Sequence, residues 1–184
     1  MTEPIRTAHT ADLSTAELHE IRAFLDTAFD GDFSDEDWDH TIGGLHAFVR
    51  DEHGLAAHGS LVQRRVLHRG RSLRTGYVEG VAVRADCRRH GLGGRVMDAL
   101  ERAIDAAYVL GALSASDEGA VLYEARGWQV WPGRLAALGP DGVVPLPDEE
   151  GTTYVRPAAG RKLPEASDAL HDTLYFDWRD GDVL

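Results

Sequence analysis

Apolar residues recur every three or four positions in several segments of the chain, a spacing that predicts amphipathic helices. Two of these segments open with a capping-box pattern, Ser14 with Glu17 and Ser34 with Asp37, whose side chains satisfy the free N–H groups of a helix start. Four helices are predicted, marked by Leu18, Ile21, Leu25, Ala28 and Phe29; by the short stretch 34–42, ended by Gly43 and Gly44; by Val96, Met97, Leu100, Ile104 and Ala107; and by Asp117–Arg126, ended by Gly127.

Other segments read as strands, with turn signals at their ends. The turns at 51–54 and 69–71 are short, so the strands that they join are expected to be antiparallel neighbours. Residues 132–151 hold four of the seven prolines and are expected to form a loop. The predicted strands are residues 5–10, Leu45–Arg50, Leu55–His68, Ser72–Val83, Val109–Leu113, Trp128–Trp131, Thr152–Arg156 and Thr173–Trp178.

The order of these elements indicates an α/β or α+β fold. With 184 residues and no internal repeat or long linker, residues 1–184 are expected to form a single domain. The first ten residues lack the apolar core of a secretory signal, and no apolar run is long enough to span a bilayer. One strand has an unusual centre: Tyr77, Glu79, Val81 and Val83 share one face, and Gly80 among them predicts a bulge or a close backbone approach.

The net charge is −12, which makes nucleic acid and anionic membranes poor partners and favours a cationic one. The acidic residues gather in three groups. Three solvated loops would explain them, and so would a shared pocket for a polycation. The groups are Asp30, Asp32, Asp35, Glu36, Asp37 and Asp39; Asp148, Glu149 and Glu150; and Asp177, Asp180 and Asp182.

A glycine-rich turn follows the strand that ends at Val83 and opens a helix. Backbone N–H groups and the helix dipole favour an anion at such a place, and Arg88 and Arg89 add side-chain donors. The segment matches neither the P-loop nor the dinucleotide-binding fingerprint. It is interpreted as a pyrophosphate cradle, with an ordinary turn as the alternative.

The histidines, the cysteine and two serines could also have chemical roles, but no metal-binding or nucleophilic role is predicted for them. The nine histidines have no familiar ligand spacing, so they are interpreted as scattered surface residues and no metal is expected. Cys87, the single cysteine, lies beside Arg88, which would lower the pKa of its thiol, but no acyl-enzyme is expected. Ser114 and Ser116 are interpreted as a polar contact and a helix cap.

The pattern Arg88-x-x-Gly91-x-Gly93 after a valine-rich strand, with a tyrosine on the next helix, resembles the GNAT N-acetyltransferase superfamily. More narrowly, the chain is similar to the aminoglycoside 2'-N-acetyltransferases in segments that run from one end to the other. These are Gly31-Asp32-Phe33, Asp37-Trp38, Gly43-Gly44, residues 76–83 (GYVEGVAV), Gly111-Ala112-Leu113-Ser114, Leu122-Tyr123 and residues 177–183 (DWRDGDV).

The resemblance implies a GNAT fold: a mixed, mostly antiparallel sheet with splayed central strands and flanking helices. It also implies acetyl-CoA as co-substrate, direct transfer of the acetyl group in a ternary complex, and therefore a cytoplasmic location. Val81 would donate its N–H to the thioester oxygen, Tyr123 would act as general acid, and Glu79 would accept the amine proton. The expected acetyl-CoA contacts are Val81, Ala82, Val83, Arg88, Arg89, His90, Gly91, Leu92, Gly93, Gly94, Ser114 and Tyr123.

On the acceptor side the resemblance implies a cationic aminoglycoside, acetylated at its 2'-amine. The expected contacts are Asp32, Asp37, Glu79, Gly80, Ser114, Glu149, Trp178, Asp182 and Leu184. The chain departs from the family at Leu184, where a tryptophan is expected, so a ring contact to the acceptor is lost. Another polyamine as acceptor, and a catalytically weak acyl-CoA-binding protein, stay open as alternatives. A homodimer is expected by analogy only.

Overall fold

The computed structural model describes residues 4–166 and 172–184. Its residues form two compact units, each built from two stretches of chain. Unit 1 takes up Met1–Val62 and Val78–Ala103, and unit 2 takes up Gln63–Tyr77 and Ile104–Leu184. Three long elements contribute residues to both units: β3 (Gly54–His68), β4 (Arg71–Val83) and α3 (Leu92–Ala107).

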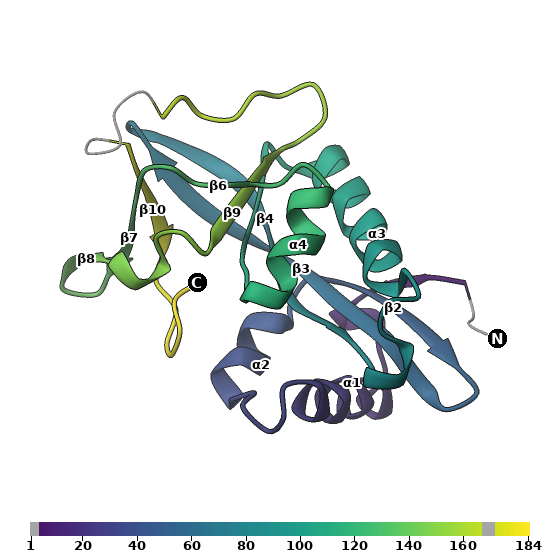
Figure 1. The fold of residues 1–184 in the computed structure, drawn as a ribbon. Helices are drawn as coiled ribbons and strands as arrows, with labels where there is room; N and C mark the ends of the chain where they lie inside the picture. Colours follow the sequence, from purple (N-terminus) through teal and green to yellow (C-terminus); the bar gives the residue numbers. More distant parts are fainter. Residues whose placement is uncertain (1–3, 167–171) are drawn as a thin grey trace. The chain divides into compact units, whose positions relative to one another are not determined.

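Unit 1 begins with β1 (Arg6–His9), a 3₁₀ turn (Thr10–Asp12), α1 (Thr15–Ala28), α2 (Asp35–Thr41) and β2 (Leu45–Asp51) (Figure 1). A further 3₁₀ turn (Ala85–Cys87) follows β4. Both predicted capping boxes are confirmed, because each cap serine accepts from the backbone three residues on while that residue's carboxylate accepts from the serine. The strands β1, β2 and β3 are antiparallel neighbours.

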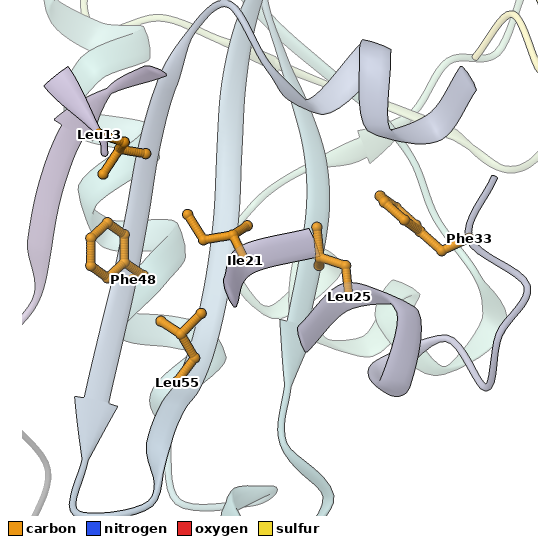
Figure 2. Packing of buried hydrophobic residues seen from close by; sticks show 6 residues of the cluster. All are labelled: Leu13, Ile21, Leu25, Phe33, Phe48 and Leu55. Atoms are coloured by element: carbon orange, nitrogen blue, oxygen red, sulfur yellow. The ribbon is translucent and has the colours of Figure 1, made fainter. Parts of the chain in front are cut away.

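The core of unit 1 lies between α1 and the strands β2 and β3. Ile21 and Leu25 of α1 are completely buried and pack with Phe48 and Leu55 (Figure 2). On the other face of β3, the backbone of Gly59 lies so close to Val96 of α3 that an added Cβ would meet its methyl group at 2.8 Å. The two helices therefore cover opposite faces of β3, and a small residue at position 59 lets α3 pack closely.

Unit 2 contains a hairpin formed by the end of β3 and the start of β4. Its two turn residues, Arg69 and Gly70, both have positive φ (47° and 76°), as a tight two-residue turn between twisted strands requires. The remaining elements of unit 2 are β5 (Leu110–Ser114), α4 (Asp117–Ala125), β6 (Gln129–Val130), β7 (Arg134–Gly139), β8 (Gly142–Pro145), a 3₁₀ turn (Pro147–Glu149), β9 (Thr153–Pro157) and β10 (Thr173–Asp177).

The strand pairing is mixed and mostly antiparallel, as the fold class predicted. Two pairs are parallel, β4 with β5 and β7 with β10. The pairing of β4 with β5 is confined to Thr75–Tyr77 and Leu110–Ala112, although β4 has 13 residues and β5 has 5. None of the helices in the described parts of the chain combines the length and the hydropathy needed to cross a bilayer.

The structure corrects three expectations. Residues 132–151 are not a loop, because they contain the hairpin β7–β8. Its prolines lie before, between or at the end of the strands, where a missing N–H costs no ladder hydrogen bond. Phe29 caps the end of α1 and is 40% exposed, stacked on Phe33. Ala107, at the last position of α3, is exposed and lies outside the buried stripe.

Candidate active site

An irregularity in β4 shapes the unit 1 part of the predicted site. Gly80 has φ +53° within the strand, a conformation that side chains other than glycine adopt with strain. A Cβ added there would lie 3.3 Å from Oγ1 of Thr41 and 3.4 Å from a methyl group of Leu25. The close approach predicted at Gly80 is confirmed, and its neighbours come from α1 and α2.

A chain of side chains holds the Gly80 carbonyl. Nδ1 of His58 lies 2.9 Å from this oxygen, so Nδ1 must carry the proton and donate it. Nε2 of the neutral ring then accepts from Nδ1 of His46, at 3.0 Å. Nε2 of His46 in turn accepts from the hydroxyl of Thr10 at 2.8 Å, and that hydroxyl oxygen accepts from the N–H of Gly43. These hydrogen bonds together assign the proton of each neutral ring to Nδ1, in His46 and in His58.

Burial keeps both imidazoles neutral. Burial, with a smaller contribution from the neighbouring His46, lowers the pKa of His58 to about 3. It also lowers the pKa of His46 to about 4, with a smaller contribution from His9. The hydrogen-bond chain therefore exists in one protonation state near neutral pH.

The residues around Gly80 follow from this arrangement. The carbonyl of Glu79 accepts from the hydroxyl of Ser60 at 3.5 Å, so side chains of β3 engage two consecutive carbonyls of β4. Val81, Ala82 and Val83 are partly buried. The backbone then returns to regular pairing, where the N–H of Arg84 donates to the carbonyl of Ala56.

The loop that was predicted to hold a pyrophosphate is exposed. Arg88, Arg89 and His90 are all exposed, and Arg89 and Gly91 have left-handed backbones, with φ of 63° and 76°. Buried Leu92 fixes the start of α3, and Gly93 and Gly94 fill its first turn, where N–H groups have no partner within the helix. Exposed arginines at the free N-terminus of a 16-residue helix suit a pyrophosphate.

The expected lowering of the Cys87 pKa is wrong. Burial raises the pKa of its thiol, and the neighbouring Asp86 adds to the rise. The nearby cation, Arg84, is engaged by two carboxylates, at 2.5 Å from Asp51 and 2.7 Å from Asp86. Cys87 is therefore a poor nucleophile.

The acidic residues of the 30–39 group differ in what they do. Asp32 is exposed. Asp37 uses one carboxylate oxygen to accept from the N–H of Ser34 at 2.8 Å, within the capping box of α2. Asp35 pairs with Arg22. Asp32 is thus the most accessible of the two predicted contacts in this group.

Unit 2 brings together predicted residues from two of the acidic groups and from β5. The Ser114 hydroxyl donates to Glu149 at 3.2 Å. Burial raises the pKa of Glu149, and the charge of Asp182 raises it further, which places the two carboxylates close together. A buried carboxylate whose pKa is raised in this way favours binding of a cation. Ser116 caps α4, as expected.

A buried arginine holds the last segment of the chain against unit 2. Arg64 is 2% exposed and donates to Asp177 and to the carbonyl of Val183, at 2.8 and 2.7 Å. Trp178 is 40% exposed, which excludes a core role, and Leu184 is buried. Asp177 is thus a partner of Arg64, whereas the neighbouring Asp182 faces Glu149.

Tyr123, the predicted general acid, is 6% exposed and lies on α4. Its ring packs near those of Trp128 and Tyr154, with centroids 6.2 and 6.3 Å away. The hydroxyl of Tyr154 donates to Glu124 at 2.8 Å. Tyr123 is thus held in an aromatic cluster that fixes the direction of its ring.

The interpretation of the histidines as scattered surface residues is wrong for His40, His46, His58 and His68, which are buried. The sequence could have indicated this burial for two of them, because His46 and His58 lie at inward-facing positions of the side-chain alternation in apolar strands. Arg64 was missed in the same way. No cluster of three or more potential metal ligands occurs in residues 4–166 and 172–184, and His171 lies outside them.

Residues 9–131 match the family model described as an acetyltransferase (GNAT) domain. The chain belongs to the GNAT acetyltransferase family. A curated relative from Mycolicibacterium fortuitum, named aminoglycoside 2'-N-acetyltransferase, is 45% identical over 181 residues, which cover 97% of this chain and 90% of the relative.

Solved structures agree on the fold of this GNAT acetyltransferase. The comparison with Escherichia coli ElaA gives a TM-score of 0.59 at 14% identity. The match covers 85% of this chain and 99% of ElaA. The E. coli GNAT family N-acetyltransferase YhbS, solved in complex with CoA, gives a TM-score of 0.58 at 17% identity. The match covers 94% of this chain and 88% of YhbS. The sequence resemblance to the GNAT superfamily is thus confirmed.

The two buried histidines predict how stability depends on pH. Below pH 6.5 the unfolded chain protonates both rings, whereas the folded protein does so only near pH 4 and below. The contribution of the two neutral rings to the free energy of unfolding is therefore fully present above pH 6.5. It is lost as the pH drops toward 4, by at most about 1.4 kcal/mol per pH unit for each histidine. Denaturant titrations at several pH values measure this slope.

The variant His58→Gln removes one of the two titrating rings and reduces the slope. His53→Gln is the control, because His53 is exposed and its loss leaves the slope unchanged. A slope that is equal in all three proteins would contradict the neutral histidine chain.

Proposed function

We propose that this protein transfers an acetyl group from acetyl-CoA to the 2'-amine of an aminoglycoside. The observation that carries the proposal is the 45% identity to a named aminoglycoside 2'-N-acetyltransferase along 97% of the chain. Membership of the GNAT family supports acetyl transfer. Acetylation replaces an ammonium group of the antibiotic by a neutral amide, so resistance would follow. A cytoplasmic location and a homodimer stay predictions.

The donor side of the proposal rests on unit 1. Acetyl-CoA, when bound, supplies an activated acetyl thioester. Arg88, Arg89 and the N–H groups from Gly91 to Gly94 would hold its pyrophosphate, which their exposure and the α3 dipole support. The N–H of Val81, directly after the irregular Gly80, would donate to the carbonyl oxygen that gains charge in the transition state.

The acceptor side rests on carboxylates and an indole. Asp182 and Glu149, with the hydroxyl of Ser114, would bind ammonium groups of the antibiotic in unit 2. Asp32 in unit 1 is exposed and would bind a further one, and Trp178 offers an accessible ring face. Carboxylates also raise the pKa of an amine that they bind, so most of them must serve the amines that do not react.

Two side chains would move protons. Glu79 would accept the proton of the reacting amine, directly or through water. Tyr123 would protonate the departing thiolate, because a phenol with a pKa of about 10 can donate to a thiolate whose conjugate acid is near 8.5 when well placed. No covalent enzyme intermediate is needed, in accord with the raised pKa of Cys87.

The first test measures thiol release from acetyl-CoA with three acceptors. Gentamicin C carries a 2'-amine, kanamycin A a 2'-hydroxyl, and spermidine is a simple polyamine. The proposal predicts turnover with gentamicin C and at least tenfold less with the others. Equal rates with both aminoglycosides would overturn the 2' position, and turnover with spermidine alone would favour the polyamine alternative.

The second test compares Tyr123→Phe with Tyr154→Phe. Each variant removes one hydroxyl from the same aromatic cluster. Loss of a general acid is expected to lower kcat about 10²–10⁴-fold in Tyr123→Phe, with the KM for acetyl-CoA little changed. Tyr154→Phe, which loses only the bond to Glu124, should keep kcat within a few fold. Unchanged kcat in Tyr123→Phe would contradict the general-acid role, whereas negligible turnover of the wild-type protein would favour the binding-protein alternative.

A further inference from the structure

Unit 2 contains a basic cavity of about 550 Å³ that the acetyl-transfer proposal does not use. It is lined by the β3–β4 hairpin, the start of β5 and the segment 161–165. Six of the chain's 19 lysines and arginines line it, against one lining carboxylate, Glu165, in a protein of net charge −12. The six are Arg65, Arg69, Arg71, Arg74, Arg161 and Lys162.

Most of these cations are not neutralised within the protein. Arg69 pairs with the buried carboxylate of Asp172 at 2.7 Å, and Arg74 donates to a backbone carbonyl. The exposed side chains of the other four (Arg65, Arg71, Arg161 and Lys162) make no hydrogen bond or ion pair with a described residue. Like charges gathered around one cavity repel one another, and a bound anion removes this repulsion.

A buried polar side chain also lies at the wall of the cavity. His68 lines the cavity and is 7% exposed, yet its buried Nε2 makes no hydrogen bond among the described residues. This atom lies 3.4 Å from Oδ1 of Asp172, without the geometry of a hydrogen bond. Nε2 thus lies against the carboxylate of Asp172, and the imidazole adds a titratable ring to the basic lining.

The cavity also has apolar walls. Leu73, Val109, Leu110, Leu163 and Pro164 line it. Its volume lies in the range of small-molecule sites, of the order of 300–1,000 Å³. Arginine forks bind phosphate oxygens in pairs, whereas the apolar walls suit an organic group attached to the phosphate.

We propose that this cavity binds a phosphate-bearing organic anion of nucleotide size. All of its lining residues belong to unit 2, whereas the pyrophosphate loop 88–94 belongs to unit 1. The site is thus separate in sequence from the one assigned to acetyl-CoA, although both offer arginines to a phosphate. Asp172 neutralises Arg69, and Glu165 is the single lining carboxylate, so four of the six positive charges remain in excess.

The test uses the full chain and ATP as probe, with inorganic tripolyphosphate as the second arm. Calorimetric titration is run at physiological salt, with and without saturating CoA. We expect ATP to bind at a site that CoA does not compete away, and at least tenfold tighter than tripolyphosphate. Arg65→Gln combined with Arg161→Gln should weaken that binding at least tenfold. Arg102→Gln, an exposed arginine on α3, is the control and should leave it unchanged.

Thiol release separates this proposal from the proposed function. The double variant should keep kcat and the KM for acetyl-CoA within about twofold, because neither arginine belongs to the acetyl-transfer site. The proposal is overturned if CoA competes away all ATP binding, if Arg102→Gln weakens it equally, or if tripolyphosphate binds as tightly as ATP. It is also overturned if the double variant only dissolves a dimer, since an acidic segment of a second copy would then fill the cavity.

Discussion

The hydrogen bond from His58 to the carbonyl of Gly80 is the constraint on which the unit 1 part of the site depends. It engages the carbonyl with a side chain, at a residue that has a left-handed backbone inside β4. Without a side chain, Gly80 also lets α1 and α2 approach the strand. The Val81 amide is the proposed donor to the thioester oxygen. Its position therefore depends on His58 of β3, which is itself held by His46 of the neighbouring strand β2.

Electrostatics divide the functions within unit 2. The buried Arg64 neutralises Asp177 and holds the last residues of the chain, whereas the negative charge of Asp182 acts on Glu149 and raises its pKa. The basic cavity gathers six cations elsewhere in the same unit. Acidic and basic side chains thus gather in different parts of the sequence of unit 2.

Much of the fold could be predicted from the sequence, because the signals were local. The capping boxes at Ser14 and Ser34 and the glycine stops depend only on neighbouring residues, and both boxes are confirmed. The hairpin β7–β8 was missed because prolines outweighed its apolar residues. Only Leu135, Ala136 and Ala137 of β7 are buried in the hairpin, and β7 pairs with β10, which lies far away in the chain.

The site was predicted unevenly for the same reason. The loop 88–94 and the acidic groups have a recognisable composition. The histidine chain does not, since His46 and His58 gain their roles from burial and from each other. The pKa of Cys87 was misjudged because the expectation rested on Arg88, whereas burial and Asp86 raise this pKa. The cation beside the thiol is Arg84, which is engaged by Asp51, a residue 33 positions earlier. Partners that are distant in the sequence determine the protonation and the role of such side chains, and these partners cannot be identified from the sequence alone.

The central claim is that the backbone at Gly80 positions the acetyl-transfer site. The most direct measurement is kcat of Gly80→Ala, compared with Gly142→Ala, which also has positive φ (134°) but no atom within 4 Å of its added Cβ. A displaced Val81 amide is expected to lower kcat at least tenfold in Gly80→Ala while the folded protein still forms, and Gly142→Ala should keep its activity. A wild-type kcat in Gly80→Ala would contradict the account.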